Sequence, residues 1–184
     1  GAAIEQSSLE KAEVYNKRYT QYIAANPHDC LGSYVFLWGQ KQEYTLTWYG
    51  LFTKEGKPTQ AIDALQIAWS GLSPSSSTPS IAGLWVNQKN AYSGLHLGAN
   101  SINHALADAY LIQYNQTPND TQNLRYSWKI LAESNDKKAG GDVENEAAEI
   151  PGLIKKGKTK QIQFKAPSEE GSYRLFVTIE YQNK

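Results

Sequence analysis

The stretches Leu124-Arg-Tyr-Ser-Trp-Lys-Ile130 and Tyr173-Arg-Leu-Phe-Val-Thr-Ile-Glu-Tyr181 both place apolar residues at every second position. Successive side chains of a β-strand point to opposite faces, so residues two apart share one face. The residues that share the apolar face are Leu124, Tyr126, Trp128 and Ile130 in the first stretch and Tyr173, Leu175, Val177 and Ile179 in the second. The pattern predicts two strands that each bury one face against a core.

Three more short runs of the same period lie between these stretches and the preceding part of the chain. They cover residues 81–86, 103–108 and 160–164, and clusters of Gly, Asn, Asp and Pro separate them. Several short strands without a convincing helix between them favour an antiparallel β-sandwich over residues 80–184. The charged residues 134–149 predict a long connection or a weak helix.

Before the sandwich, the hydrophobic period changes to that of a helix. Apolar residues recur at three- and four-residue steps over about 8–25, and Ser7 or Ser8 is available as the cap of this helix. Pro58 is well placed as the first residue of a second helix, because proline needs no hydrogen-bond partner there. Ser70-Gly71 ends that helix.

An uninterrupted apolar run, residues 33–38, lies between the two predicted helices. Such a run predicts a strand buried on both faces, as in a parallel sheet. The Ser- and Pro-rich residues 72–79 predict a linker, which divides the chain into residues 1–71 and 80–184. The expected fold class is therefore α+β: a helix-strand-helix portion followed by an antiparallel sandwich.

Charge and hydropathy exclude two classes of partner. The 184 residues contain 18 Lys and Arg against 18 Asp and Glu, which gives a net charge of zero. A nucleic-acid binder normally carries a basic excess, and no apolar run approaches the length of a membrane-spanning helix. We therefore expect neither nucleic acid nor a membrane as a partner.

The cysteine and histidine content gives no metal signature. Cys30 is the single cysteine, so the chain has no internal disulfide, and His28, His96 and His104 lie far apart without ligand spacing. We expect no cofactor and no metal. The sequence also has no Met, which indicates a piece of a longer chain.

Residues 80–184 resemble an immunoglobulin-like or PKD-like β-sandwich, through Arg125-Tyr-Ser-Trp-Lys129 and the run Glu170–Val177. In that fold a Trp on the third strand fills the centre, and a Tyr after Gly ties a corner by its hydroxyl. The resemblance gives these structural roles to Trp128 and Tyr173. Because the chain stops shortly after this penultimate strand, we expect the sandwich to lack its last strand and to leave an open edge.

Residues 7–71 resemble the closing part of a (β/α)8 glycoside hydrolase barrel of the retaining clan that uses two Glu residues. The resemblance is carried by residues 32–39 as the eighth strand, 47–52 as the loop after it, and 57–61 opening the eighth helix. It implies a partial barrel end whose catalytic carboxylates lie upstream, so that this fragment alone is not an enzyme.

The resemblance also implies a set of substrate-binding residues at the carboxyl end of that strand, where barrels carry their chemistry. Trp38 would form a flat platform under a sugar, or it plugs a core. Trp48 and Tyr49 would line a cleft, or they pack the loop onto the barrel end. Glu43, with Gln40 beside it, would hold a substrate hydroxyl, or it is a solvated loop acid.

Two hypotheses on function follow. In the first, the chain is the C-terminal part of a glycoside hydrolase-like protein that acts on a β-linked glycan. In the second, it is a non-catalytic carbohydrate-binding or spacer module. Carbohydrate is the expected partner, with a homodimer through Val35 and Leu37 of an exposed strand as a further expectation. The glycan resemblance and the sandwich favour a secreted or periplasmic protein.

Overall fold

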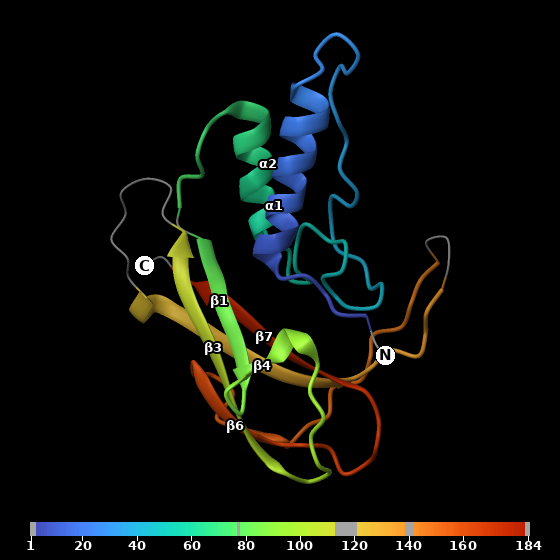
Figure 1. Ribbon diagram of the computed structural model, residues 1–184, viewed down its shortest axis with the longest axis vertical. Coiled ribbons are helices and arrows are strands. Elements are labelled where there is room, and N and C mark those ends of the chain that lie inside the picture. The colour runs from blue at the N-terminus through green and yellow to red at the C-terminus, as the bar shows by residue number, and fades with distance from the viewer. Residues whose placement is uncertain (1–2, 77, 113–120, 139–141, 183–184) are drawn as a thin grey trace.

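Two helices lie side by side over a pair of antiparallel β-sheets (Figure 1). The computed structural model describes residues 3–76, 78–112, 121–138 and 142–182. Within these residues the fold is α+β with antiparallel sheets, which confirms the predicted fold class. We call residues 3–76, which hold the two helices, the helical unit, and the strands that follow form the sandwich. None of the helices in the described residues is long and apolar enough to cross a membrane.

The first helix, α1 (Ser8–Arg18), begins at a capping box. The Ser7 hydroxyl accepts a hydrogen bond from Glu10 N at 3.2 Å, and Ser7 N donates to Glu10 Oε2 at 2.7 Å. This satisfies N–H groups that the first helical turn leaves without partners. The helix continues as a π-helical turn over Tyr19–Ala24, so the helical span ends close to the predicted boundary.

The second helix, α2 (Gln60–Ser70), confirms the predicted end but not the predicted start. Gly71 closes it with φ of 70°, a conformation that costs glycine little. Thr59 is the N-cap, and its N–H and hydroxyl both donate to Leu51 O, at 3.0 and 2.9 Å. Pro58 precedes this cap and pairs with Phe52, so the prediction of Pro58 as the first helical residue is wrong.

The strands form two sheets. The larger has the order β2-β1-β3-β6-β5 and the smaller pairs β4 with β7, all antiparallel. The strand bounds are β1 Thr78–Val86, β2 Lys89–Asn90, β3 Ile102–Ile112, β4 Leu124–Ala132, β5 Ile154–Lys155, β6 Gln161–Lys165 and β7 Tyr173–Tyr181. The five predicted strands are present, and β1 begins inside the predicted linker.

Apart from β2, the strand order matches the order described for immunoglobulin constant-type sandwiches. Strands β1, β3, β6 and β5 follow the order A-B-E-D of one sheet, and β4 and β7 follow C-F of the other. The place of the G strand, beside β7, holds no strand among the described residues. The edge of β7 on that side is therefore unpaired.

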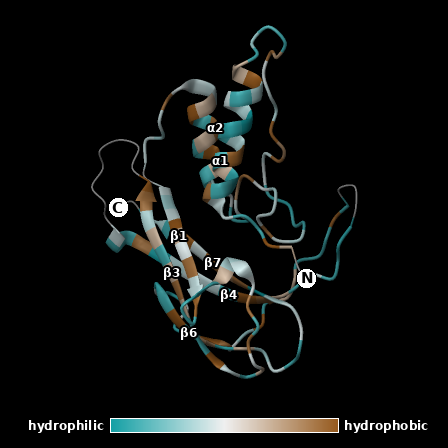
Figure 2. Cartoon of the chain, viewed as in Figure 1, coloured by the Kyte–Doolittle hydropathy of each residue, from teal (hydrophilic) through white to brown (hydrophobic). Residues whose placement is uncertain are grey.

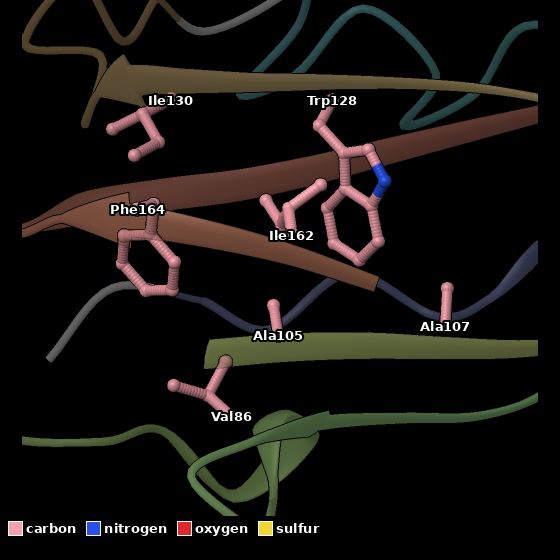
Figure 3. Close-up of a cluster of buried hydrophobic side chains, with 7 residues drawn as sticks. All are labelled: Val86, Ala105, Ala107, Trp128, Ile130, Ile162 and Phe164. Atoms are coloured by element: carbon pink, nitrogen blue, oxygen red, sulfur yellow. The ribbon is translucent and has the colours of Figure 1, made fainter. Parts of the chain in front are cut away.

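The core of the sandwich lies between the two sheets (Figure 3). Its buried members are Val86, Ala105, Ala107, Trp128, Ile130, Ile162 and Phe164. Trp128 is 5% exposed and its indole Nε1 donates to Thr159 O at 2.8 Å. The Tyr173 hydroxyl donates to Glu169 O at 3.0 Å, which ties the corner before β7. The structural roles expected for both residues are confirmed.

The predicted buried strand over residues 33–38 is wrong. The segment is irregular, with bends at Phe36 and Trp38, it belongs to no sheet, and Tyr34 is fully exposed. A strand buried on both faces needs neighbouring strands and covering helices. Among the described residues, this segment is covered on one side only, by the two helices. Val35 packs there against the small core of Leu51, Ala61 and Leu65.

Several side-chain contacts join the helical unit to the sandwich. Gln60 Nε2 donates to Pro79 O at 3.1 Å, and Lys57 forms an ion pair of 2.7 Å with Glu180 on β7. The buried carboxylate of Glu144 accepts a hydrogen bond of 2.8 Å from Tyr44 N. The described part of residues 134–149 is a connection rather than a helix.

Candidate functional site

In residues 33–38 every second side chain is exposed. Tyr34, Phe36 and Trp38 are exposed at 104%, 61% and 62%, whereas Val35 and Leu37 are half-buried. In Figure 2 the chain that descends beside α1 is coloured hydrophobic over part of its length, although it lies at the surface.

Backbone and side-chain hydrogen bonds hold this segment in place. Leu37 O accepts a hydrogen bond from Leu51 N at 3.4 Å, and Gly39 O accepts one from Phe52 N at 3.2 Å. The Tyr15 hydroxyl on α1 donates to Phe36 O at 2.9 Å. The segment is therefore fixed between α1 and the loop that precedes α2.

Six aromatic rings from this segment and the following loop form two groups of ring contacts, a chain of four and a separate pair of Trp38 with Phe52, and we call the six together the aromatic cluster. They are Phe36, Trp38, Tyr44, Trp48, Tyr49 and Phe52. Phe36 meets Tyr49 edge to face at 6.0 Å between ring centroids, and Trp38 meets Phe52 in the same way at 5.4 Å. Edge-to-face contacts are a preferred geometry of aromatic pairs.

A cavity of about 300 Å³ opens beside the cluster, between α1 and the loop that carries Trp48 and Tyr49. From the helical side, its wall includes Lys11, Tyr15 and Arg18. The wall thus combines the three aromatic rings of Tyr15, Trp48 and Tyr49 with cationic and hydroxyl groups. Ligand pockets commonly join apolar walls with a small number of fixed polar groups.

The charges of the cavity wall are partly paired. Glu5 forms an ion pair with Lys11 and accepts hydrogen bonds from Thr45 Oγ1 at 2.6 Å and Thr47 Oγ1 at 2.8 Å. Burial raises the pKa of the Tyr15 hydroxyl, and the charge of Arg18 lowers it by a smaller amount. Tyr15 thus stays a neutral hydrogen-bond donor at neutral pH.

The structure brings together two of the five predicted site residues, Trp48 and Tyr49, which contact each other and line the cavity. Trp38 contacts Phe52 instead and lies outside the cavity wall. Gln40 is engaged within the loop, where its Nε2 donates to Leu46 O at 3.1 Å. Glu43 forms an ion pair of 3.0 Å with Lys41.

Sequence reasoning missed Phe36 and Tyr15. Phe36 lay in a run interpreted as a buried strand, and Tyr15 lay on the apolar stripe of a predicted helix. The available signal was an aromatic residue at every second position, Tyr34, Phe36 and Trp38, in a run that is apolar throughout.

Comparison with known proteins adds no relative. No protein-family model matches the chain, and no curated protein matches it in sequence. Among the described residues, no three His, Cys, Asp or Glu side chains form a group that could hold a metal ion. The geometry of the aromatic cluster and its cavity is therefore the basis for a functional conclusion.

Proposed function

We propose that the chain binds a carbohydrate at the aromatic cluster and the adjoining cavity. The observation that carries this proposal is the juxtaposition of exposed rings with a polar-walled cavity, through Trp48 and Tyr49. The C–H faces of a sugar are weakly apolar and pack on indole and phenol rings, while its hydroxyls need hydrogen-bond partners. Tyr49 supplies such a ring at 41% exposure, and the wall of the cavity supplies the polar groups.

Binding rather than cleavage is the function that the described residues support. Retaining hydrolysis of a glycoside uses two carboxyl groups about 5 Å apart that flank the scissile bond. Glu5, in the cavity wall, forms an ion pair with Lys11. Glu43, in the loop that carries Trp48 and Tyr49, forms an ion pair with Lys41. The resemblance of the sequence to the end of a glycoside hydrolase barrel extends the proposal to a β-linked glycan, with catalysis carried by residues outside this sequence. The expected eighth strand of that barrel, residues 32–39, belongs to no sheet, so this extension rests on the sequence alone.

The proposal is tested with three hexasaccharides of glucose: β-1,3-linked, β-1,4-linked and, for comparison, α-1,4-linked. Isothermal titration calorimetry with the purified chain measures the affinity for each. We expect binding of a β-linked oligosaccharide, and a loss of at least tenfold in affinity for Trp48→Ala and Tyr49→Ala. Trp69→Ala is the matched control, because Trp69 is exposed on α2 and outside the cavity wall.

Two results would contradict the proposal. One is the absence of heat and of fluorescence change with all three oligosaccharides at millimolar concentration. The other is binding that Trp48→Ala and Tyr49→Ala leave unchanged, since the sugar would then lie elsewhere on the molecule.

A further inference from the structure

The five-stranded sheet has one face in the core of the sandwich and a second face that points away from it. Figure 3 shows Ala105 and Ala107 of β3 and Ile162 of β6 pointing into the core. Because side chains alternate along a strand, the residues next to these in sequence lie on the opposite side of the sheet. Residues paired across strands share a face, so the register extends this assignment to β1 and β5.

We call this second side of the sheet the outer face. Its side chains are exposed or half-buried, in contrast to the buried residues with which they alternate. The members on which the proposal rests are Gly83 and Trp85 on β1, Gln161, Gln163 and Lys165 on β6, and Lys155 on β5. The helical unit contacts the other sheet, where Lys57 pairs with Glu180 on β7.

The indole of Trp85 lies flat on Gly83. A Cβ atom placed on Gly83 would lie 2.1 Å from Cη2 of Trp85, and 2.5 and 2.7 Å from its Cζ2 and Cζ3. Distances so similar to three ring atoms put the Cβ position above the plane of the ring rather than beside its rim. Glycine therefore lets one ring face rest on the backbone, and the other ring face is turned away from the sheet.

Unpaired positive charge gathers at the other end of the outer face. Lys155 and Lys165 lie on this face, and Lys156 and Lys158 are exposed in the turn between β5 and β6. Among the described residues, no carboxylate forms an ion pair with any of these four lysines, whereas Lys160 pairs with Asp108. Because the whole chain has a net charge of zero, this end of the sheet holds a local excess of positive charge.

The aromatic ring and the lysines lie at opposite ends of one row of strands. Three strand spacings separate β1 from β5, which amounts to about 14 Å. Trp85 and Gln161 are both opposite Leu106, and Gln163 is opposite Lys155, so the two glutamines lie between the ring and the lysines. Their amide groups both donate and accept hydrogen bonds, as the hydroxyls of a sugar require.

We propose that the outer face binds an acidic polysaccharide, whose sugar units carry carboxylates, across the strands from Trp85 to Lys155. The free face of the indole packs on the C–H face of one sugar, and the glutamines bind hydroxyls of the next. Lys155 and Lys165 pair with carboxylates further along the chain. The charge of this surface is thus complementary to an anionic glycan, while the net charge of zero disfavours nucleic acid.

Isothermal titration calorimetry with two matched hexasaccharides tests the proposal on the whole chain. Both are β-1,4-linked, one of mannuronate and one of mannose, so that they differ only in the carboxylate at C6 of each sugar. We expect the mannuronate hexasaccharide to bind about tenfold more tightly than the mannose hexasaccharide. The difference should shrink as the salt concentration rises, because salt screens exposed charges.

Two variants test the aromatic ring. Trp85→Ala removes the indole, and Gly83→Ala displaces it, because the added methyl group would overlap the ring. We expect each variant to weaken binding of the mannuronate hexasaccharide about tenfold. Trp69→Ala is the matched control, since Trp69 is exposed on α2, and should bind this hexasaccharide as the wild-type chain does.

A double variant tests the charges and keeps the ring. Lys155→Gln combined with Lys165→Gln should remove the preference for the mannuronate over the mannose hexasaccharide. Lys17→Gln, at an exposed lysine of α1, should leave this preference unchanged. Because Lys155 and Lys165 are both exposed, the double variant decides the question even if a substitution at Trp85 or Gly83 prevents folding.

Three outcomes would overturn the proposal. The first is equal affinity for the two hexasaccharides, or no binding of either at millimolar concentration. The second is mannuronate binding that folded Trp85→Ala or the double lysine variant leaves unchanged. The third is tighter binding of a thymidylate hexanucleotide, which would assign the outer face to nucleic acid. Binding at the aromatic cluster is measured separately, with glucose hexasaccharides and Trp48→Ala, so the two proposals can fail independently.

Discussion

The guanidinium group of Arg174 on β7 binds both carboxylate oxygens of Glu133, which follows β4, with Nη2 at 2.9 Å from Oε1. Both side chains are largely buried, at 14% and 10% exposure. The same Nη2 donates to Ala3 O, so one cation ties the end of the β4–β7 sheet to the segment before α1. Bidentate pairs of this kind are stronger than exposed single contacts.

The ion pair of Arg174 with Glu133 predicts that the free energy of unfolding decreases in acid. Burial raises the pKa of the Glu133 carboxyl, but the hydrogen bonds and charge of Arg174 and Lys137 outweigh burial and lower it below the ordinary 4.5. A carboxyl with a lowered pKa stabilises the fold above its unfolded-state pKa and loses that contribution as the pH falls through the folded-state value. We expect the urea midpoint to drop below about pH 4. Glu133→Gln should show a smaller drop between neutral and acid pH.

The control for this prediction is Glu149→Gln, which removes an exposed carboxyl 3.9 Å from Lys129. It should follow the pH profile of the wild-type chain closely, because exposed ion pairs contribute little. If Glu133→Gln and the wild-type chain had parallel profiles, the coupling between Glu133 and Arg174 would be refuted.

The hydroxyl of Tyr15 predicts that the stability of residues 33–38 has the opposite pH dependence: it is lost in alkaline solution. Its raised pKa means that its stabilising contribution is complete below the unfolded-state value near 10 and is lost as the pH rises through the folded-state value. Loss of the hydrogen bond to Phe36 O in Tyr15→Phe should cost about 0.5–1.5 kcal/mol. It should also speed amide exchange in residues 33–38. Tyr22→Phe, at an exposed tyrosine of the same helical span, should change neither measurement.

Trp128 is the side chain whose removal should cost most in the sandwich. Trp128→Ala deletes a buried indole together with the hydrogen bond to Thr159 O, and we expect a loss of about 3–5 kcal/mol in the free energy of unfolding. Trp69→Ala, at a residue 43% exposed, is the matched control. Urea unfolding followed by circular dichroism measures both, and equal losses would show that burial does not distinguish the two residues.

The hydroxyl of Tyr173 predicts a smaller effect at the corner before β7. Tyr173→Phe removes the hydrogen bond to Glu169 O and keeps the ring, so the expected loss is about 0.5–1.5 kcal/mol. Tyr110→Phe on β3 serves as the control for a tyrosine hydroxyl at the surface. An unfolding free energy for Tyr173→Phe equal to that of the wild-type chain would contradict a structural role for this corner.

The capping box of α1 allows a comparison of two neighbouring serines. Ser7→Ala removes the oxygen that accepts from Glu10 N and should cost about 1 kcal/mol. Ser8 is the first helical residue, and Ser8→Ala should be close to neutral. Equal effects of the two substitutions on thermal unfolding would rule out Ser7 as the cap.

The sandwich could be predicted from the sequence, because the alternation of apolar and polar residues within each strand identifies it without information from the rest of the chain. The bounds of β7 agree with the stretch from Tyr173 to Tyr181, since alternation identifies both the strand and its buried face. The run from Ser33 to Trp38 lacks this property. An apolar run without alternation predicts burial on both faces, but burial depends on neighbouring elements that the local sequence does not encode.

The candidate site could be predicted only in part for the same reason. The resemblance pointed to Trp38, Trp48 and Tyr49, and the structure brings the last two into contact at the cavity while Trp38 contacts Phe52. The hydrogen bond from Tyr15 to Phe36 spans 21 residues and joins α1 to the irregular segment 33–38. Local periodicity carries no information on such a contact, because it depends on how the helix and the segment pack.

Because Trp128 is buried, its fluorescence can be separated from that of the other tryptophans. The remaining four tryptophans, at positions 38, 48, 69 and 85, are all exposed to some degree, and three of them lie in the helical unit. A water-soluble quencher such as acrylamide should quench the fluorescence of the exposed indoles at lower concentration than that of Trp128. The residual emission then comes from the centre of the sandwich, so melting of the helical unit and melting of the sandwich can be followed separately without any added label.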